Sequence, residues 1–250
     1  MVRWYAFFVF AAGLLIAAEA DILRFGPNGA FQLEYKTDDS GLLAHGVMER
    51  LADGTTKSYP LPQSNLEIYA KLRPADLKRN PIAATGNRYE CEETIGPHQV
   101  EGDKLWFGNS FYDSEGERGV GTFGYFDAAT RLYQLYSPPE VAPYEVSAIL
   151  VEANVVWLGL DYSSEDISVF PGGLVEWNRK TQAVHRYPIE FVVSQIERQG
   201  GSLRLTTREG YALLTGETLQ RFQVSTNTNG KVETTPIEKF PPPPSHHALL

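Results

Sequence analysis

The chain of 250 residues is long enough for one large domain or two small ones, and its 42% hydrophobic and 12% aromatic content excludes wholesale disorder. The net charge of −9 argues against a nucleic-acid-binding protein, because contacts with phosphates need a basic face. The same charge suits cationic partners, metal ions or simple solubility.

The first twenty residues are typical of a secretory signal peptide. Arg3 supplies a positive charge, residues 4–18 form an apolar run, and Ala18-Glu19-Ala20 fits the small-x-small cleavage pattern. We therefore expect cleavage before Asp21 and a mature protein that is secreted or periplasmic, with no membrane span after cleavage. An uncleaved anchor helix is the alternative, although the apolar run is short for a spanning helix.

Turn signals divide the next segment, residues 22–62, into short strands. Gly26-Pro27-Asn28-Gly29 predicts a turn, and Asp53-Gly54 is a hairpin dipeptide. The strands predicted on either side of these turns are residues 22–25, 31–35, 46–51 and 55–59. The following segment, residues 64–97, is less regular, with two strands expected at 66–72 and 86–95.

Residues 97–139 and 143–188 show the same order of strand signals. Leu-Trp-Phe-Gly from Leu105 corresponds to Val-Trp-Leu-Gly from Val156, and in both segments a second hairpin follows after a long polar stretch. These polar stretches, residues 109–121 and 161–171, are predicted to be loops between the second and third strands.

A compact version of the same pattern covers residues 190–224, and residues 231–237 predict one more strand. The proline-rich residues 241–250 are expected to form a disordered tail, in which His246 and His247 are solvated.

A glycine opens each predicted outer hairpin, at Gly46, Gly86, Gly124, Gly173 and Gly210. A spacing near 40 residues with four strands per unit is typical of a β-propeller. We therefore predict an all-β protein whose residues 21–240 form a β-propeller of about five four-stranded blades. In a closed ring, the strand at residues 22–25 would complete the last blade. The alternatives are a sandwich or barrel of unrelated strands, an incomplete array of sheets, or an assembled dimer.

These motifs also resemble those of known propellers. The Pro-x-x-Val, Leu-Trp-Phe-Gly and Gly-Tyr-Phe-Asp pattern resembles the repeats of streptogramin (virginiamycin B) lyase-like proteins, and is similar to the propeller sensor domains of hybrid two-component regulators. The resemblance is best over residues 97–139 and 143–188, and it implies a fold more than a function. For a lyase it would imply a histidine general base, for which His45, His98 and His185 are the candidates.

The two long polar stretches supply the predicted binding site. They belong to neighbouring predicted blades, so we expect them to share one face, and each carries an aromatic residue, serine and carboxylates. The predicted ligand-binding residues are Tyr112, Asp113, Glu115, Glu117, Asp161, Tyr162, Glu165 and Asp166. Carboxylate oxygens suit Ca²⁺ or a cationic ligand, and the alternative is an ordinary acidic surface.

Several other residues are assigned to structure. Cys91 is the only cysteine, so it cannot form an intramolecular disulfide, and we expect it on a buried strand face; a reactive thiol would need a neighbouring base. We expect Trp106, Trp157 and Trp177 in the core between blades and not on a stacking platform.

The sequence thus predicts an exported binding or interaction module that recognises a protein, glycan or small-molecule ligand through one loop-bearing face. The alternative is a metal-assisted lyase or hydrolase that uses His98 or a carboxylate. No catalytic residue is assigned, since the sequence has no Gly-x-Ser-x-Gly elbow, phosphate loop, His-Glu-x-x-His or Cys-x-x-Cys motif.

Overall fold

The computed structural model describes residues 23–38, 41–62, 92–112, 121–164, 167–187, 189–226 and 231–237. Regular structure in these residues is β-strand apart from the short 3-10 turn Pro27–Gly29, which confirms the predicted all-β class. No helix in this part of the chain is long and apolar enough to cross a membrane. The predicted signal peptide, the proline-rich tail and Cys91 lie outside the described residues.

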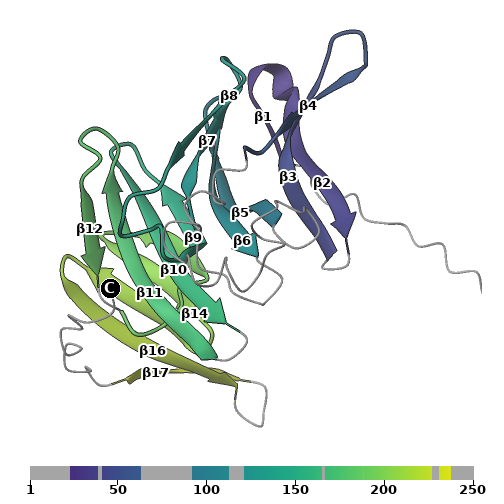
Figure 1. Ribbon diagram of the computed structural model, residues 1–250. Coiled ribbons are helices and arrows are strands. Elements are labelled where there is room, and N and C mark those ends of the chain that lie inside the picture. The colour runs from purple at the N-terminus through teal and green to yellow at the C-terminus, as the bar shows by residue number, and fades with distance from the viewer. Residues whose placement is uncertain are drawn as a thin grey trace, which may run out of the picture.

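The strands form three antiparallel sheets that comprise four consecutive meanders, which lie side by side in chain order (Figure 1). The first two meanders are joined into one eight-stranded sheet by a single bridge between Ala44 and Ile95. The first contains β1 (Arg24–Phe25), β2 (Phe31–Asp38), β3 (Gly41–Arg50) and β4 (Thr56–Pro60). The second contains β5 (Glu92–Glu101), β6 (Lys104–Tyr112), β7 (Phe123–Asp127) and β8 (Leu132–Tyr136). The third contains β9 (Glu145–Val151), β10 (Val155–Ser164), β11 (Ile167–Asn178) and β12 (Val184–Tyr187). The fourth contains β13 (Gln195–Gln199), β14 (Ser202–Thr207), β15 (Gly210–Thr215) and β16 (Thr218–Thr226), and β17 (Val232–Ile237) pairs with β16 at its outer edge.

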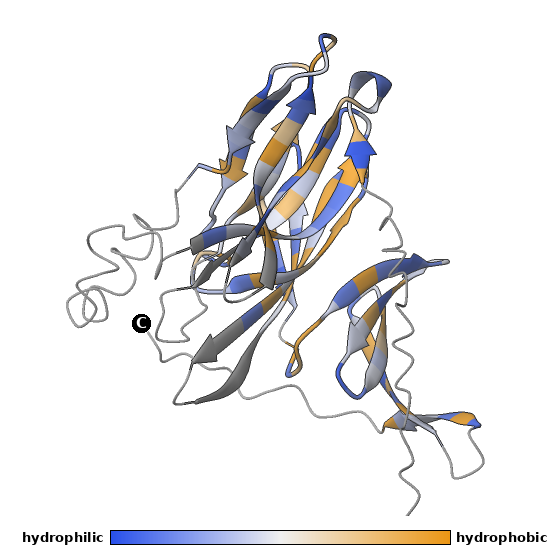
Figure 2. Ribbon diagram, turned by 90° about the vertical axis from the view of Figure 1, so that its right-hand side faces the viewer, coloured by the Kyte–Doolittle hydropathy of each residue, from blue (hydrophilic) through white to orange (hydrophobic). Residues whose placement is uncertain are grey.

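Alternation along the second strand of each meander determines how the meanders pack. In β6, Leu105 and Phe107 face the first meander, whereas Trp106 faces the third. In β10, Val156 and Leu158 face the second meander and Trp157 faces the fourth. Because successive residues of a strand point to opposite faces, the two middle meanders bury both faces, and hydrophobic residues form bands along their strands (Figure 2).

We call the three interfaces between successive meanders seams. Each seam holds its own hydrophobic core, and Trp106, Trp157 and Trp177 are 2%, 7% and 2% exposed within them. The expectation that these tryptophans lie in the core is therefore confirmed.

The outward face of the fourth meander differs from the seams. Leu203 and Leu205 of β14 face the third meander, and Arg204 between them occupies the position that Trp106 and Trp157 occupy in β6 and β10. The Arg204 side chain is 35% exposed and pairs with Glu197. A polar outer face at the end of a stack of sheets favours solubility.

A glycine in the third strand makes the same close approach to the fourth strand in all four meanders. A Cβ atom at Gly46, Gly124, Gly173 or Gly210 would lie 2.5, 2.0, 2.8 or 2.2 Å from a backbone carbonyl oxygen of the fourth strand. Each glycine thus allows the outer hairpin to close, as the sequence pattern predicted for these four positions. Gly86 lies outside the described residues.

An arginine–carboxylate pair bridges each seam. Two nitrogens of Arg131 contact Glu49 at 2.8 and 3.0 Å, and those of Arg179 contact Glu101 at 2.6 and 2.7 Å. Arg198 contacts Glu152 in the same two-pronged way at 2.8 and 2.5 Å. Such bidentate pairs are stronger than single hydrogen bonds. All three lie at the edge that carries the turns between first and second and between third and fourth strands.

The tryptophans help to hold two of these carboxylates in place. The indole Nε1 of Trp106 donates to Glu101 at 3.1 Å, and that of Trp157 donates to Glu152 at 3.0 Å. The guanidinium of Arg179 also lies 4.9 Å from the centre of the Trp106 ring, within the range of a cation–π contact.

Two predicted loops are partly strand. Within residues 161–171, Asp161 pairs with Pro171 and Tyr162 with Phe170, so β10 and β11 continue as a longer hairpin. β6 also continues to Tyr112 by pairing with β5. Loops were predicted here because many of the residues are polar. The aromatic and β-branched residues among them favour a strand instead.

Two further predictions about the ends of the array need correction. Residues 92–97 were predicted to belong to a separate unit, residues 64–97, but they form the start of β5. The rest of that unit lies outside the described residues. The strand at residues 22–25 does not complete the last meander. Its described part, β1, pairs with β2, and Phe25 packs 5.6 Å from Phe31, ring centre to ring centre, in the first seam.

Substitution of Gly124 tests the closure of the outer hairpin. We expect Gly124→Ala to lower the free energy of unfolding by about 1–3 kcal/mol, because the added methyl group would overlap the Gln134 carbonyl oxygen. Gly201→Ala is the matched control, since a Cβ there meets no atom within 4 Å. Urea denaturation measures both. Equal stability of the two variants would contradict this role.

The seam pairs predict a pH dependence of stability. The Arg131, Arg179 and Arg198 guanidiniums lower the pKa values of Glu49, Glu101 and Glu152 below their usual 4.5. A carboxylate with a lowered folded-state pKa contributes stability above its unfolded-state pKa and loses that contribution as the pH falls through the folded-state value. We expect the urea midpoint of the protein to fall more steeply below about pH 4.5 than that of Glu101→Gln/Glu152→Gln. The exposed Glu190→Gln is the control; parallel curves for the double variant and the protein would refute the assignment.

Candidate functional site

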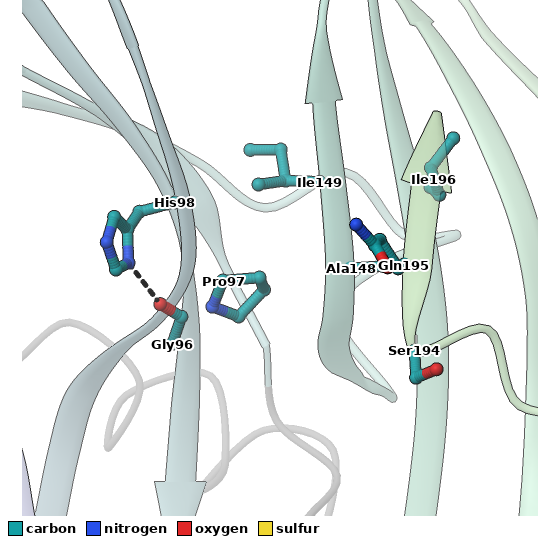
Figure 3. A pocket seen from close by; sticks show the side chains of 8 residues that line it. All are labelled: Gly96, Pro97, His98, Ala148, Ile149, Ser194, Gln195 and Ile196. Atoms are coloured by element: carbon teal, nitrogen blue, oxygen red, sulfur yellow. Dashed lines mark hydrogen bonds between the residues drawn. The ribbon is translucent and has the colours of Figure 1, made fainter. Parts of the chain in front are cut away.

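Three first strands converge on one hollow. β5, β9 and β13, the first strands of the second, third and fourth meanders, line an open space of about 310 Å³, with β9 between the other two (Figure 3). Its lining residues are Gly96, Pro97, His98, Ala148, Ile149, Ser194, Gln195 and Ile196. The hollow therefore lies where β5 of the first sheet meets the edge strands β9 and β13 of the other two.

The hollow combines an apolar wall with a few polar groups. Pro97, Ala148, Ile149 and Ile196 supply the apolar surface. Small-molecule sites are usually more enclosed and more apolar, with volumes of roughly 300–1,000 Å³, so this open hollow of mixed lining has only the size of a small site.

The polar groups come from β5 and from the start of β13. His98 Nδ1 lies 2.9 Å from the Gly96 carbonyl oxygen, which can only accept, so a neutral ring carries its hydrogen on Nδ1 and presents Nε2 as an acceptor. Ser194 Oγ donates to Thr206 O at 3.3 Å, and Gln195 Nε2 donates to Glu197 at 2.7 Å. The Ser194 hydroxyl and one Gln195 N–H thus donate to protein partners, whereas the second Gln195 N–H and both side-chain oxygens retain hydrogen-bonding capacity.

Side chains bridge the first strands beside the hollow. The carboxamide of Gln99 in β5 makes two hydrogen bonds with the backbone of Val151 in β9, at 2.9 and 3.1 Å. Ser147 of β9 donates to Val193 O, just before β13, at 2.8 Å. In the described residues, β5, β9 and β13 do not pair with one another. Side chains, and not a neighbouring strand, therefore bond to these main-chain groups.

The predicted acidic site is only partly described. Asp161 lies in β10, opposite Glu145 of β9 and Pro171 of β11, and is partly buried. Tyr112 and Tyr162 lie in β6 and β10, and nothing is described of their side chains. Asp113, Glu115, Glu117, Glu165 and Asp166 lie outside the described residues, so their convergence stays a prediction.

The three candidate histidines lie apart. His98 lines the hollow, His45 is in β3, and His185 is in the outer strand β12, 3.5 Å from Glu217. No carboxylate lines the hollow. Within the described ranges, no group of three or more His, Cys, Asp or Glu side chains is arranged to hold a metal ion.

Sequence reasoning did not identify most of the hollow. Of its lining residues only His98 was weighed, as a candidate base. Ala148, Ile149, Ser194 and Ile196 are ordinary strand residues, and no spacing distinguishes them from the rest of the sheets. Their common feature is that each belongs to, or immediately precedes, the first strand of a meander.

Comparison with family models and with curated proteins gave no match. Among solved structures, similarity was found to the extracellular domain of BT4673 from B. thetaiotaomicron, described as a hybrid two component system, at a TM-score of 0.28 and 9% identity over 84% of this chain. A second structure of that domain, described as a one component system, gave 0.25 and 10% over 86%. The chain spans 38% of each solved chain, and these scores carry no argument about function.

Proposed function

We propose that this protein is an exported ligand-binding module, built from propeller-like blades, that binds a small or extended ligand in the hollow between β5, β9 and β13. The export half of this proposal rests on the signal-like residues 1–20. The order of the last three meanders supports the propeller-like arrangement, because β5 neighbours β9 and β9 neighbours β13.

The observation that carries the proposal is that strands of three separate sheets, two of them edge strands, line one space. Strand edges present main-chain donors and acceptors at fixed positions, and here apolar side chains such as Ile149 and Ile196 stand beside them. A rigid scaffold with a few fixed polar groups recognises a ligand and needs no chemical step. Binding without a reaction therefore explains the hollow better than catalysis does. Among the lining residues only His98 has a side chain that could act as a general base.

The acidic residues at the opposite edge from the arginine pairs form a second part of the proposal. The strand extensions that carry Tyr112 and Asp161 end at the edge of the second-to-third strand connections. We propose that these connections bind the cationic part of a ligand, or Ca²⁺, beside the hollow.

A ligand panel tests the hollow. Monosaccharides, free amino acids and capped dipeptides are each added at millimolar concentration to the purified protein, and the melting temperature is measured. We expect at least one class to raise it, because a ligand that binds the native state stabilises that state. Ser194→Trp should abolish the shift by filling the hollow, whereas Thr130→Trp, in the exposed β7–β8 turn, should retain it. A shift that persists in Ser194→Trp, or no shift with any class, would contradict the proposal.

A calcium titration tests the acidic edge separately. We expect millimolar calcium to raise the melting temperature of the protein but not that of Asp113→Ala/Asp161→Ala. The double variant Asp53→Ala/Asp103→Ala, with both changes in exposed turns at the opposite edge, is the control. If the protein itself shows no shift, calcium binding at this edge is wrong.

A further inference from the structure

The main chain of β9 presents one edge to the hollow. Within the described residues β9 pairs with β10 on one side and with no strand on the other. The Glu152 N–H donates to Val155 O at 2.9 Å, so the backbone of Glu152 points toward β10. In an antiparallel pair, backbone groups of alternate residues point to opposite edges. Those of Val151 and Ile149 therefore point to the free edge.

The carboxamide of Gln99 already occupies one position on this edge. Its Nε2 donates to Val151 O at 3.1 Å, and its Oε1 accepts from Val151 N at 2.9 Å. A residue of an added antiparallel strand makes the same pair of bonds, one given and one received. Gln99 thus acts as a one-residue substitute for a neighbouring strand.

The next position with the same orientation belongs to Ile149, which lines the hollow. Ile149 is only 9% exposed, and buried main-chain groups require hydrogen-bond partners. A partner that continues the pattern set by Gln99 would be another amide, placed in the hollow with its N–H and C=O along the edge of β9.

We propose that the hollow binds an extended, uncharged peptide segment as an added strand on β9, with Ile149 N–H and C=O bonded to the main chain of the segment. This inference rests on the proposed function and names its ligand class. Extended peptides are commonly recognised at free sheet edges in this way, with main-chain bonds for affinity and neighbouring side chains for selectivity.

The lining residues define which segment fits. His98 is the one titratable side chain among them, so the site offers no fixed charge to pair with an ionised side chain. Pro97 and Ile196 give apolar contacts, and Ser194 and Gln195 give acceptor oxygens. The volume of about 310 Å³ accommodates a short stretch with small side chains, such as valine or threonine.

Hydrogen exchange of the Ile149 amide in the purified protein tests this assignment directly. The probe is acetyl-Thr-Val-Thr-amide, and its matched control is the same peptide with an N-methyl group on valine, which lacks the central donor. At a free peptide concentration about ten times its Kd, we expect exchange at Ile149 to slow about tenfold. The N-methyl peptide should leave exchange at Ile149 unchanged. The Val151 amide, already bonded to Gln99, should respond to neither peptide.

The outcomes separate this inference from the proposed function. Equal effects of the two peptides, or spectral changes in the hollow without protection of Ile149, would refute strand addition. If a monosaccharide perturbs His98 and Ser194 while neither peptide binds, the hollow is a ligand site but its ligand is not a peptide. If no probe perturbs any lining residue, both proposals fail.

Discussion

The structure depends on the need of each middle sheet to bury two faces. A four-stranded meander standing alone would leave both sides of β6 or β10 in water, with Trp106 or Trp157 exposed on one of them. Stacking the meanders removes both sides from water at once, because successive residues of these strands point in opposite directions. The cores therefore lie between sheets, one to a seam, and no central core is needed. On the outward face of the fourth meander, Arg204 occupies the position that tryptophan has in β6 and β10. This face can therefore remain in contact with water.

The candidate site is a consequence of this packing. Face-to-face stacking brings the first strands together at their edges, and these edges do not pair with each other in the described residues. Gln99 and Ser147 satisfy some of the main-chain groups left there, and the remaining space is the hollow. Recognition at such a site depends on the spacing of three separate sheets. Residues in the seams therefore influence the hollow without contacting a ligand.

Sequence patterns predicted the strands of the middle meanders well, because Gly and Asn or Asp punctuate them and tryptophan alternates with aliphatic residues. The same reasoning failed at residues 161–171, where local polarity suggested a loop but Tyr162 and Phe170 pair across the hairpin. It also placed a boundary at Pro97, whereas β5 continues through that proline by shifting its register. The hollow was not predictable, since Ile149 and Ser194 meet only after the meanders stack. The sequence pointed instead to a binding site formed by acidic residues, most of which lie outside the described residues.

The positions of the arginine–carboxylate pairs have a mechanical consequence. All three bridge their seams at one edge of the sheets, and none of them lies at the opposite edge. Successive meanders are therefore joined by charged pairs along one rim only, within the described ion pairs. Near the middle of the first strands the bridges are uncharged: Gln99 links β5 to β9, and Ser147 links β9 to the residue just before Ser194 and β13. Protonation of the three glutamates would therefore weaken one rim of the array and leave these uncharged bridges in place.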